Sequence, residues 1–257
     1  MNVKAKKHLG QHFLTDENIA KKIVEGLDFQ PYQYVLEVGP GTGVLTKYLL
    51  EKPTETYVAE IDTESIEYLK LHYQKLENKY FTGDFLKINL SDIFSGEVAV
   101  IGNFPYNISS QILFKIIENY QQIPEMVGMF QKEVAERTAA VPRTKDYGIL
   151  SVLVQAYYDV KYLFTVHENV FNPPPKVKSG VIKLTRNRKE GLEGNEILFK
   201  QIVKTGFGQR RKKLSNALKS LDIPEVLKSH AFMDKRAEEL SVEDFINFTK
   251  EWKAAKN

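Results

Sequence analysis

Short apolar runs alternate with longer amphipathic segments over residues 34–184 of the chain. The short runs are rich in β-branched and aromatic residues, which is typical of buried strands. They predict five strands: 34–39, 56–62, 79–84, 98–103 and 126–131. Apolar residues three and four positions apart predict the helices between them: Gly43–Leu50, Ser65–Leu76 and Ser110–Tyr120. This alternation predicts an α/β domain whose parallel sheet is covered by helices on both faces.

The pattern changes near residue 186. Two more strands are predicted at Tyr158–Val166 and Ser179–Thr185, on either side of a stiff proline-rich bend. A polar segment with two glycines, Arg186–Asn195, is typical of a linker. Beyond it only helices are predicted: Ile197–Phe207, Lys212–Leu221, Pro224–His230 and Val242–Trp252. We therefore predict an α/β domain over residues 1–186 and a small all-helical domain over residues 187–257.

Composition excludes several classes of protein. The chain has 257 residues, of which 42% are hydrophobic and 27% charged, as in ordinary globular proteins. No apolar run reaches the roughly 18–20 residues that a membrane span needs. The absence of cysteine excludes disulfides, thiolate metal ligands and thiol catalysis. The histidines other than His12 lack metal-ligand spacing, so no metal is expected. With no secretory signal pattern at the amino terminus, these features predict a cytoplasmic protein.

A glycine-rich loop, EVGPGTG at residues 37–43, follows the first strong strand and precedes a helix. Its spacing around Gly39 and Gly41 suits a nucleoside ligand without a pyrophosphate better than a dinucleotide. The next two strands end near Glu60 and Asp84, where Glu60 can accept hydrogen bonds from ribose hydroxyls. The alternatives are a tight turn without a ligand, and acids that are solvated or cap helices.

The fourth strand continues into Asn103-Phe104-Pro105-Tyr106. This tetrapeptide resembles the Asn/Asp-Pro-Pro-Tyr motif of S-adenosylmethionine-dependent methyltransferases that act on amino groups of bases. There the Asn side-chain oxygen and a backbone carbonyl accept the two amine hydrogens, which localises a lone pair otherwise delocalised into the ring. Pro105 fixes the backbone and Tyr106 can stack on a base lifted out of its helix. The alternative is a simple helix start capped by Asn107 or Ser109.

With these motifs, the chain resembles the KsgA/Erm family of rRNA adenine N6-dimethyltransferases over nearly its whole length. Three more segments carry the resemblance: KHLGQHFL at 7–14, NVFNPPPKV at 169–177 and FGQRRKKLSNAL at 207–218. The last two are similar to the KsgA branch rather than to the Erm branch. The resemblance implies a Rossmann-like S-adenosylmethionine-dependent methyltransferase domain followed by a helical domain that recognises rRNA. The implied substrate is a pair of adjacent adenosines in the helix 45 loop of 16S rRNA, within immature 30S subunits, and the enzyme is expected to act as a monomer.

The resemblance also assigns roles to single residues. It implies a cofactor pocket lined by His12, Leu14, Gly39, Gly41, Glu60, Asp84 and Asn103. It implies that the catalytic residues are Asn103, which accepts the amine, Pro105, and Tyr106 and Phe171, which stack on the two faces of the base. Two positions depart from the family pattern: His12, where Asn is common, and Phe104, where Leu or Ile is usual.

A cationic stretch lies in the predicted helical domain. Residues 204–219 carry six cations and no acid, among them Lys204, Arg210, Arg211, Lys212 and Lys213. Phe207, Leu214 and Leu218 are spaced to dock the segment, which leaves the cations as a ridge for phosphates. A solvated helix face is the alternative. Lys4, Lys6 and Lys7 form a second basic patch, so the net charge of +3 combines two basic patches with an acidic body.

Three alternative functions remain open from the sequence. They are an Erm-like 23S rRNA methyltransferase, a non-catalytic ribosome-assembly factor on the same fold, and a NAD-binding oxidoreductase. The intact Asn103, Pro105 and Tyr106 disfavour the assembly factor, because binding alone needs no group that positions an amine. The glycine spacing disfavours the oxidoreductase.

Overall fold

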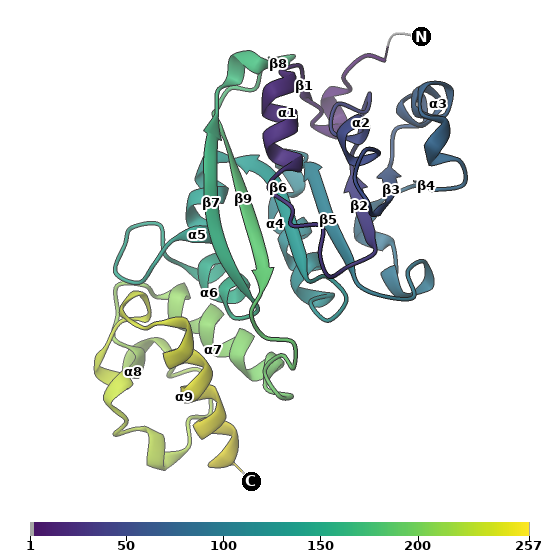
Figure 1. Cartoon of the computed structure of the whole chain (residues 1–257). Coiled ribbons are helices and arrows are strands. Elements are labelled where there is room, and N and C mark those ends of the chain that lie inside the picture. Colours follow the sequence, from purple (N-terminus) through teal and green to yellow (C-terminus); the bar gives the residue numbers. More distant parts are fainter. Residues whose placement is uncertain (1–2, 257) are drawn as a thin grey trace. The chain divides into compact units, whose positions relative to one another are not determined.

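The computed structural model describes residues 3–256, which form two compact units (Figure 1). The first unit comprises the chain up to Glu136 together with Val160–Arg186. The second comprises Arg137–Asp159 together with the chain from Asn187 onward. The second unit thus includes a segment, Arg137–Asp159, that the sequence analysis placed in the domain over residues 1–186. The recognition role of residues 187–257 stays a prediction.

A seven-stranded sheet dominates the first unit, with the strand order β4-β3-β2-β5-β6-β9-β7. A two-stranded antiparallel ladder, β1 with β8, lies apart from it. The strands are β1 Phe13–Leu14, β2 Tyr34–Val38, β3 Glu55–Glu60, β4 Tyr80–Thr82, β5 Val98–Asn103, β6 Glu125–Gln131, β7 Tyr158–Val166, β8 Phe171–Asn172 and β9 Ser179–Arg186. All seven strands predicted from the sequence are present in the sheet.

The prediction of a parallel sheet is correct for β2 to β6 and wrong for β9. Strands β4, β3, β2, β5 and β6 are parallel neighbours, whereas β9 pairs antiparallel with β6 from Glu125↔Thr185 to Gln131↔Ser179. Parallel strands need a long crossover connection, usually a helix. The chain between β7 and β9 instead holds the short proline-rich bend, so the sheet is mixed (Figure 1).

The order in which successive strands are added to the sheet reverses next to β2. The chain runs outward from β2 to β3 and β4, and then returns to the other side of β2 to form β5. At such a reversal the connections leave to opposite sides, so the carboxyl ends of the two central strands border a crevice. Gly39 directly follows β2 and Asn103 ends β5, so the fold brings both residues to this crevice.

The helices are α1 Glu17–Val24, α2 Thr46–Leu49, α3 Thr63–His72, α4 Ser109–Glu118, α5 Lys132–Ala139, α6 Ile149–Gln155, α7 Glu196–Gly208, α8 Leu214–Ala217 and α9 Val242–Ala254. The apolar residues of α1 and α2 pack with alternate residues of β5 and β6, such as Ala99, Ile101, Val127 and Met129, in one core. Val98 and Val100 of β5 are also fully buried, so this strand is covered on both faces as predicted. No helix described within residues 3–256 is long and apolar enough to cross a membrane.

Several predicted helices are shorter in the structure. The prediction of a helix over Lys212–Leu221 is wrong, because α8 covers only Leu214–Ala217. Lys213 is extended and bridges Arg236, and the Leu214 amide donates to the Lys235 carbonyl, which delays the start of the helix. Over Pro224–His230 the chain forms only a 3-10 turn, Glu225–Leu227.

Helices α1, α5 and α6 were not predicted from the sequence. Each has only seven or eight residues, so its apolar repeat is too short to predict a helix. The predicted long helices of the second unit are present as α7 and α9. Helix α9 begins with a capping box, in which the Ser241 hydroxyl accepts from the Asp244 amide and the Asp244 carboxylate from the Ser241 amide.

Candidate active site

A cavity of about 280 Å³ lies at the carboxyl ends of the central strands, where the sheet order reverses. Its wall combines the segment His8–Phe13, the glycine loop, the end of β3, residues 83–86 after β4, and residues 103–108 after β5. Eight of the residues singled out from the sequence line it: His12, Gly39, Gly41, Glu60, Asp84, Asn103, Pro105 and Tyr106. Four distant parts of the sequence therefore meet in one cavity together with the amino-terminal segment.

Gly39 and Gly41 shape the floor of this cavity through their backbone. Both have left-handed φ angles, +70° at Gly39 and +55° at Gly41, which favour glycine. A Cβ atom at Gly39 would meet no protein atom within 4 Å, whereas one at Gly41 would come within 2.8 Å of the Phe13 ring. Gly39 therefore leaves open space for a ligand beside the backbone, and Gly41 lets the amino-terminal segment pack closely.

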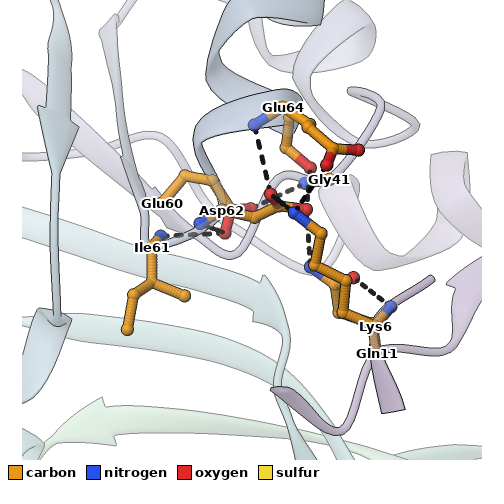
Figure 2. A network of polar contacts seen from close by, with 8 residues as sticks. Lys6, Gln11, Gly41, Glu60, Ile61, Asp62 and Glu64 are labelled. Carbon is orange, nitrogen blue, oxygen red and sulfur yellow. Dashed lines mark hydrogen bonds and ion pairs between the residues drawn. The ribbon is translucent and has the colours of Figure 1, made fainter. Parts of the chain in front are cut away.

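The Glu60 carboxylate is buried and held by backbone amides. Its side chain accepts hydrogen bonds from the amides of Gly41 at 3.2 Å, Ile61 at 2.8 Å and Asp62 at 2.9 Å (Figure 2). Burial raises the pKa of Glu60, and these amide donors act in the opposite direction. Two carboxylate oxygens offer about four acceptor positions, so capacity for a ligand hydroxyl remains after three bonds.

Asp84 serves two roles in the structure. Its carboxylate accepts from the Leu86 amide at 3.0 Å and so caps the 3-10 turn Phe85–Lys87. It also lines the cavity. The alternative of a helix cap is therefore correct without excluding a contact with a ligand.

The Asn103 side chain has a fixed amide orientation. Its Nδ2 donates to the backbone carbonyl of His12 at 2.8 Å. Among residues 3–256, no hydrogen bond to its Oδ1 is present, so the acceptor end of the amide is available at the cavity wall. The amino-terminal segment therefore sets which atom of this amide a ligand meets.

Tyr106 forms an aromatic wall next to Asn103. Its hydroxyl lies 2.5 Å from the hydroxyl of Ser179, and its ring stacks on His12 with centroids 5.5 Å apart and planes at 26°. Burial raises the pKa of Tyr106, and the Ser179 contact opposes this. The His12 ring is fixed in turn, because its Nδ1 donates to the Pro173 carbonyl at 2.8 Å.

Leu14 and Phe171 are not brought to the cavity. They are register partners in the β1–β8 ladder, and each is only 4% exposed, within the core that includes α1. Leu14 lines a separate small hollow of about 20 Å³ that shares Gly39 and Asn103. In this structure both residues support the amino-terminal segment, and their contacts with a cofactor or base stay predictions.

Two glycines leave the space that the large Phe104 side chain occupies. Phe104 is 1% exposed and packs against Phe130 with ring centroids 5.0 Å apart. A Cβ atom at Gly128 would lie 2.3 Å from its ring, and one at Gly102 would lie 2.8 Å from it. These two glycines supply the volume for the larger side chain.

Phe207, Leu214 and Leu218 of the second unit are buried as predicted. The basic residues around them fall into two groups, those with partners inside the protein and those without one among the residues described. The half-buried Arg210 donates to the Glu238 carboxylate at 2.6 Å and to the carbonyls of Thr144 and Lys145, so it is part of the framework. Lys213 pairs with Asp234 at 2.9 Å on the surface. Lys204, Arg211 and Lys212 are exposed and, within the described part of the chain, have no ion-pair partner.

The grouping of Lys4, Lys6 and Lys7 as one basic patch is wrong for Lys6. Lys4 and Lys7 are exposed, but the Lys6 ammonium pairs with Asp62 at 2.5 Å and with Glu64 at 3.1 Å. Sequence reasoning missed this pair. Nothing in the local pattern connects two residues 56 positions apart.

Glu37, in strand β2 just before the glycine-rich loop, is a buried acid whose partner is neutral. Its carboxylate accepts from the Thr46 hydroxyl at 2.6 Å and is 1% exposed. Burial raises the pKa of Glu37 to about 8, with the nearby Glu60 charge acting in the same direction.

This raised pKa predicts a pH-dependent stability. Between the ordinary pKa of 4.5 and about 8, the folded chain keeps a proton on Glu37 that the unfolded chain releases. The free energy of unfolding therefore falls as pH rises through this window, by up to about 1.4 kcal/mol per pH unit from this group. We expect Glu37→Gln to remove that slope. Urea unfolding of both proteins at several pH values measures it, and parallel profiles would contradict the prediction.

The fold and this cavity define the class of the protein: a Rossmann-like, S-adenosylmethionine-dependent methyltransferase. Residues 2–254 match the family described as ribosomal RNA adenine dimethylase, and the chain belongs to that family. It is an enzyme that dimethylates adenine in ribosomal RNA. The resemblance seen in the sequence is thereby confirmed, and the oxidoreductase and non-catalytic alternatives are wrong.

Named relatives and solved structures agree with this assignment. The chain is 58% identical to "Ribosomal RNA small subunit methyltransferase A" of Flavobacterium johnsoniae, over 98% of this chain and 97% of that protein. It is 57% identical to the protein of the same name from Cytophaga hutchinsonii, over 96% of each. A dimethyladenosine transferase from Plasmodium falciparum has a TM-score of 0.84 at 26% identity, over 95% of this chain and 98% of that one. The 23S rRNA methyltransferase ErmE has a TM-score of 0.70 at 25% identity, over 94% of this chain and 99% of that one.

Proposed function

We propose that the enzyme transfers two methyl groups to N6 of each of two adjacent adenosines in the helix 45 loop of 16S rRNA, within immature 30S subunits. The observation that carries the chemistry is the Asn103 amide, whose Nδ2 is held by His12 and whose Oδ1 is left as an acceptor in the cavity. Relatives 50–58% identical are named for the small ribosomal subunit, which supports 16S rather than 23S rRNA.

The residues of the cavity fit S-adenosylmethionine. Open space beside Gly39 suits close approach of the nucleoside or methionine part, and the buried Glu60 carboxylate retains acceptor capacity for ribose hydroxyls. Asp84 and the segment His8–Phe13 complete the wall. Among the described residues no group of three or more His, Asp or Glu side chains is arranged to hold a metal ion. When bound, the cofactor supplies an electrophilic sulfonium methyl group.

The chain's own groups then position the amine. Asn103 Oδ1 and a backbone carbonyl beside Pro105 accept the two N6 hydrogens, which turns the nitrogen lone pair out of the adenine ring toward the cofactor. Tyr106 provides the face on which the extruded base stacks, with its hydroxyl fixed by Ser179. Proton loss follows methyl transfer, so no strong base is required beside the amine.

The remaining contacts with RNA are assigned to the second unit. Lys204, Arg211 and Lys212 are exposed and unpaired among the described residues, as phosphate contacts require, and Lys213 joins them if its surface pair with Asp234 opens. Arg210 is omitted from this group because its guanidinium is used internally. We further propose that the enzyme acts as a monomer in the cytoplasm, where immature small subunits assemble.

Labelled methyl transfer into ribosomal particles tests the proposal. Undermethylated 30S particles and 50S particles are each incubated with enzyme and labelled S-adenosylmethionine, and the rRNA is then digested to nucleosides. We expect N6,N6-dimethyladenosine from 16S rRNA only, with two methyl groups on each of the two adenosines at completion. Labelling of 23S rRNA instead would favour the Erm-like alternative.

A further inference from the structure

The amino-terminal segment is held near the site by an ion pair between the half-buried Lys6 and the buried Asp62, neither of which lines the cavity. Asp62 is 2% exposed, and its carboxylate accepts from Lys6 Nζ at 2.5 Å and from Gln11 Nε2 at 3.3 Å (Figure 2). Gln11 also accepts from the Lys6 amide at 2.8 Å, so the two residues close a turn whose later residues form part of the cavity wall. The pair therefore fastens the segment His8–Phe13 to the end of β3.

Each partner of this pair connects to a different part of the site. On one side, the Asp62 amide donates to the Glu60 carboxylate at 2.9 Å, so the Asp62 backbone helps to orient the proposed ribose acceptor. On the other side, the segment that Lys6 fastens carries His12, whose carbonyl holds Asn103 Nδ2 at 2.8 Å. The ion pair is thus connected, through these contacts, to both the proposed ribose acceptor and the proposed amine acceptor.

We propose that Lys6 and Asp62 are positioning residues that hold the amino-terminal segment in the conformation that binds the cofactor and orients Asn103. Neither side chain lines the cavity, so both act through other residues. The inference rests on the proposed function of Asn103 and Glu60.

The chemistry of the pair predicts that a neutral residue does not replace Lys6. Asp62 also caps α3, because it accepts from the Glu64 amide at 3.1 Å and the Ser65 hydroxyl at 3.1 Å. Removal of Lys6 leaves that carboxylate in place, buried and without its cation, which is costly. The segment then loses its ion pair with the residue that caps α3, and the fraction of molecules with a formed cavity wall falls.

The test compares Lys6→Met with Lys7→Met, which removes an equal charge one residue away from an exposed side chain without an ion-pair partner among the described residues. For Lys6→Met we expect the Kd of S-adenosylhomocysteine, measured by calorimetry without RNA, to rise about tenfold as the competent population falls. Amide hydrogen exchange should accelerate in residues 6–14 and stay unchanged in α4 and β5. Lys7→Met should change neither quantity, and Lys6→Arg should restore most of the affinity.

A double-mutant cycle gives a second, independent reading. Lys6→Met leaves Asp62 without its cation, and Asp62→Asn leaves Lys6 with Glu64 as its remaining partner. Because both variants break the same pair, the double variant should bind the cofactor product no worse than the poorer single variant. Additive losses, or equal effects of Lys6→Met and Lys7→Met on affinity and exchange, would overturn the inference. Because these measurements use no RNA, their outcome does not depend on whether 16S rRNA is the substrate.

Discussion

Asn103→Ala is expected to reduce single-turnover methyl transfer into undermethylated 30S particles by about 10³-fold, a loss typical of a preorganised group that acts on the transition state. The substitution removes the amide oxygen that accepts the adenine amine, so the nitrogen lone pair stays delocalised into the ring. It leaves the Gly39 backbone and the Glu60 carboxylate in place.

The control for this prediction is binding of the cofactor product and of particles. We expect Asn103→Ala to retain affinity for S-adenosylhomocysteine within a few-fold and for 30S particles nearly unchanged, because the loss is confined to the chemical step. Asn89→Ala removes a comparable amide from the surface, where the Asn89 side chain donates to the Asp92 carboxylate, and this variant should turn over normally. Turnover of Asn103→Ala near that of the wild type would refute the assigned role.

Reversal of two exposed cations, in the double variant Arg211→Glu and Lys212→Glu, is expected to weaken binding to 30S particles by about 10- to 100-fold at low salt. Both side chains project from the turn between α7 and α8 and are exposed. If each neutralises one phosphate, the slope of log affinity against log salt should decrease in magnitude by about two. Filter binding over a salt series measures both quantities.

Arg210 and Lys213 are left unchanged in this test for a structural reason. Reversal of Arg210 would break its contacts with Glu238, Thr144 and Lys145 and would mix instability with lost RNA contacts. The matched control is Lys75→Glu with Lys87→Glu, two exposed cations of the first unit whose reversal changes the net charge by the same amount. An equal loss of affinity in the control would show that net charge, not this cationic turn, determines binding.

Much of the site could be predicted from the sequence because parallel strands end at one edge of a sheet. Gly39, Glu60, Asp84 and Asn103 each follow or end a predicted strand, so the alternation alone brings them together. The strand β9 was predicted but its antiparallel direction was not, because an apolar run indicates a strand without its direction.

Long-range polar contacts were beyond prediction from one sequence. From the sequence Arg210 was one more exposed cation. Its bond to Glu238 depends on how the segment after α7 packs against the 3-10 turn Ala237–Glu239 within the second unit. The short α8 likewise depends on the bridge between Lys213 and Arg236, which no local propensity contains. Local patterns therefore located the chemistry, while the partners that hold each side chain in place needed the structure.

The bond that orients Asn103 has a consequence for how freely this sequence can vary. The acceptor for Nδ2 is the main-chain carbonyl of residue 12, which every amino acid possesses. The side chain at that position can thus be exchanged, as between His and Asn, without reorienting the amide. What must be preserved is the path of the backbone, and in this chain that path depends on Lys6, Gln11 and the β1–β8 ladder. Selection on catalysis would then also act on Lys6, whose side chain does not line the cavity.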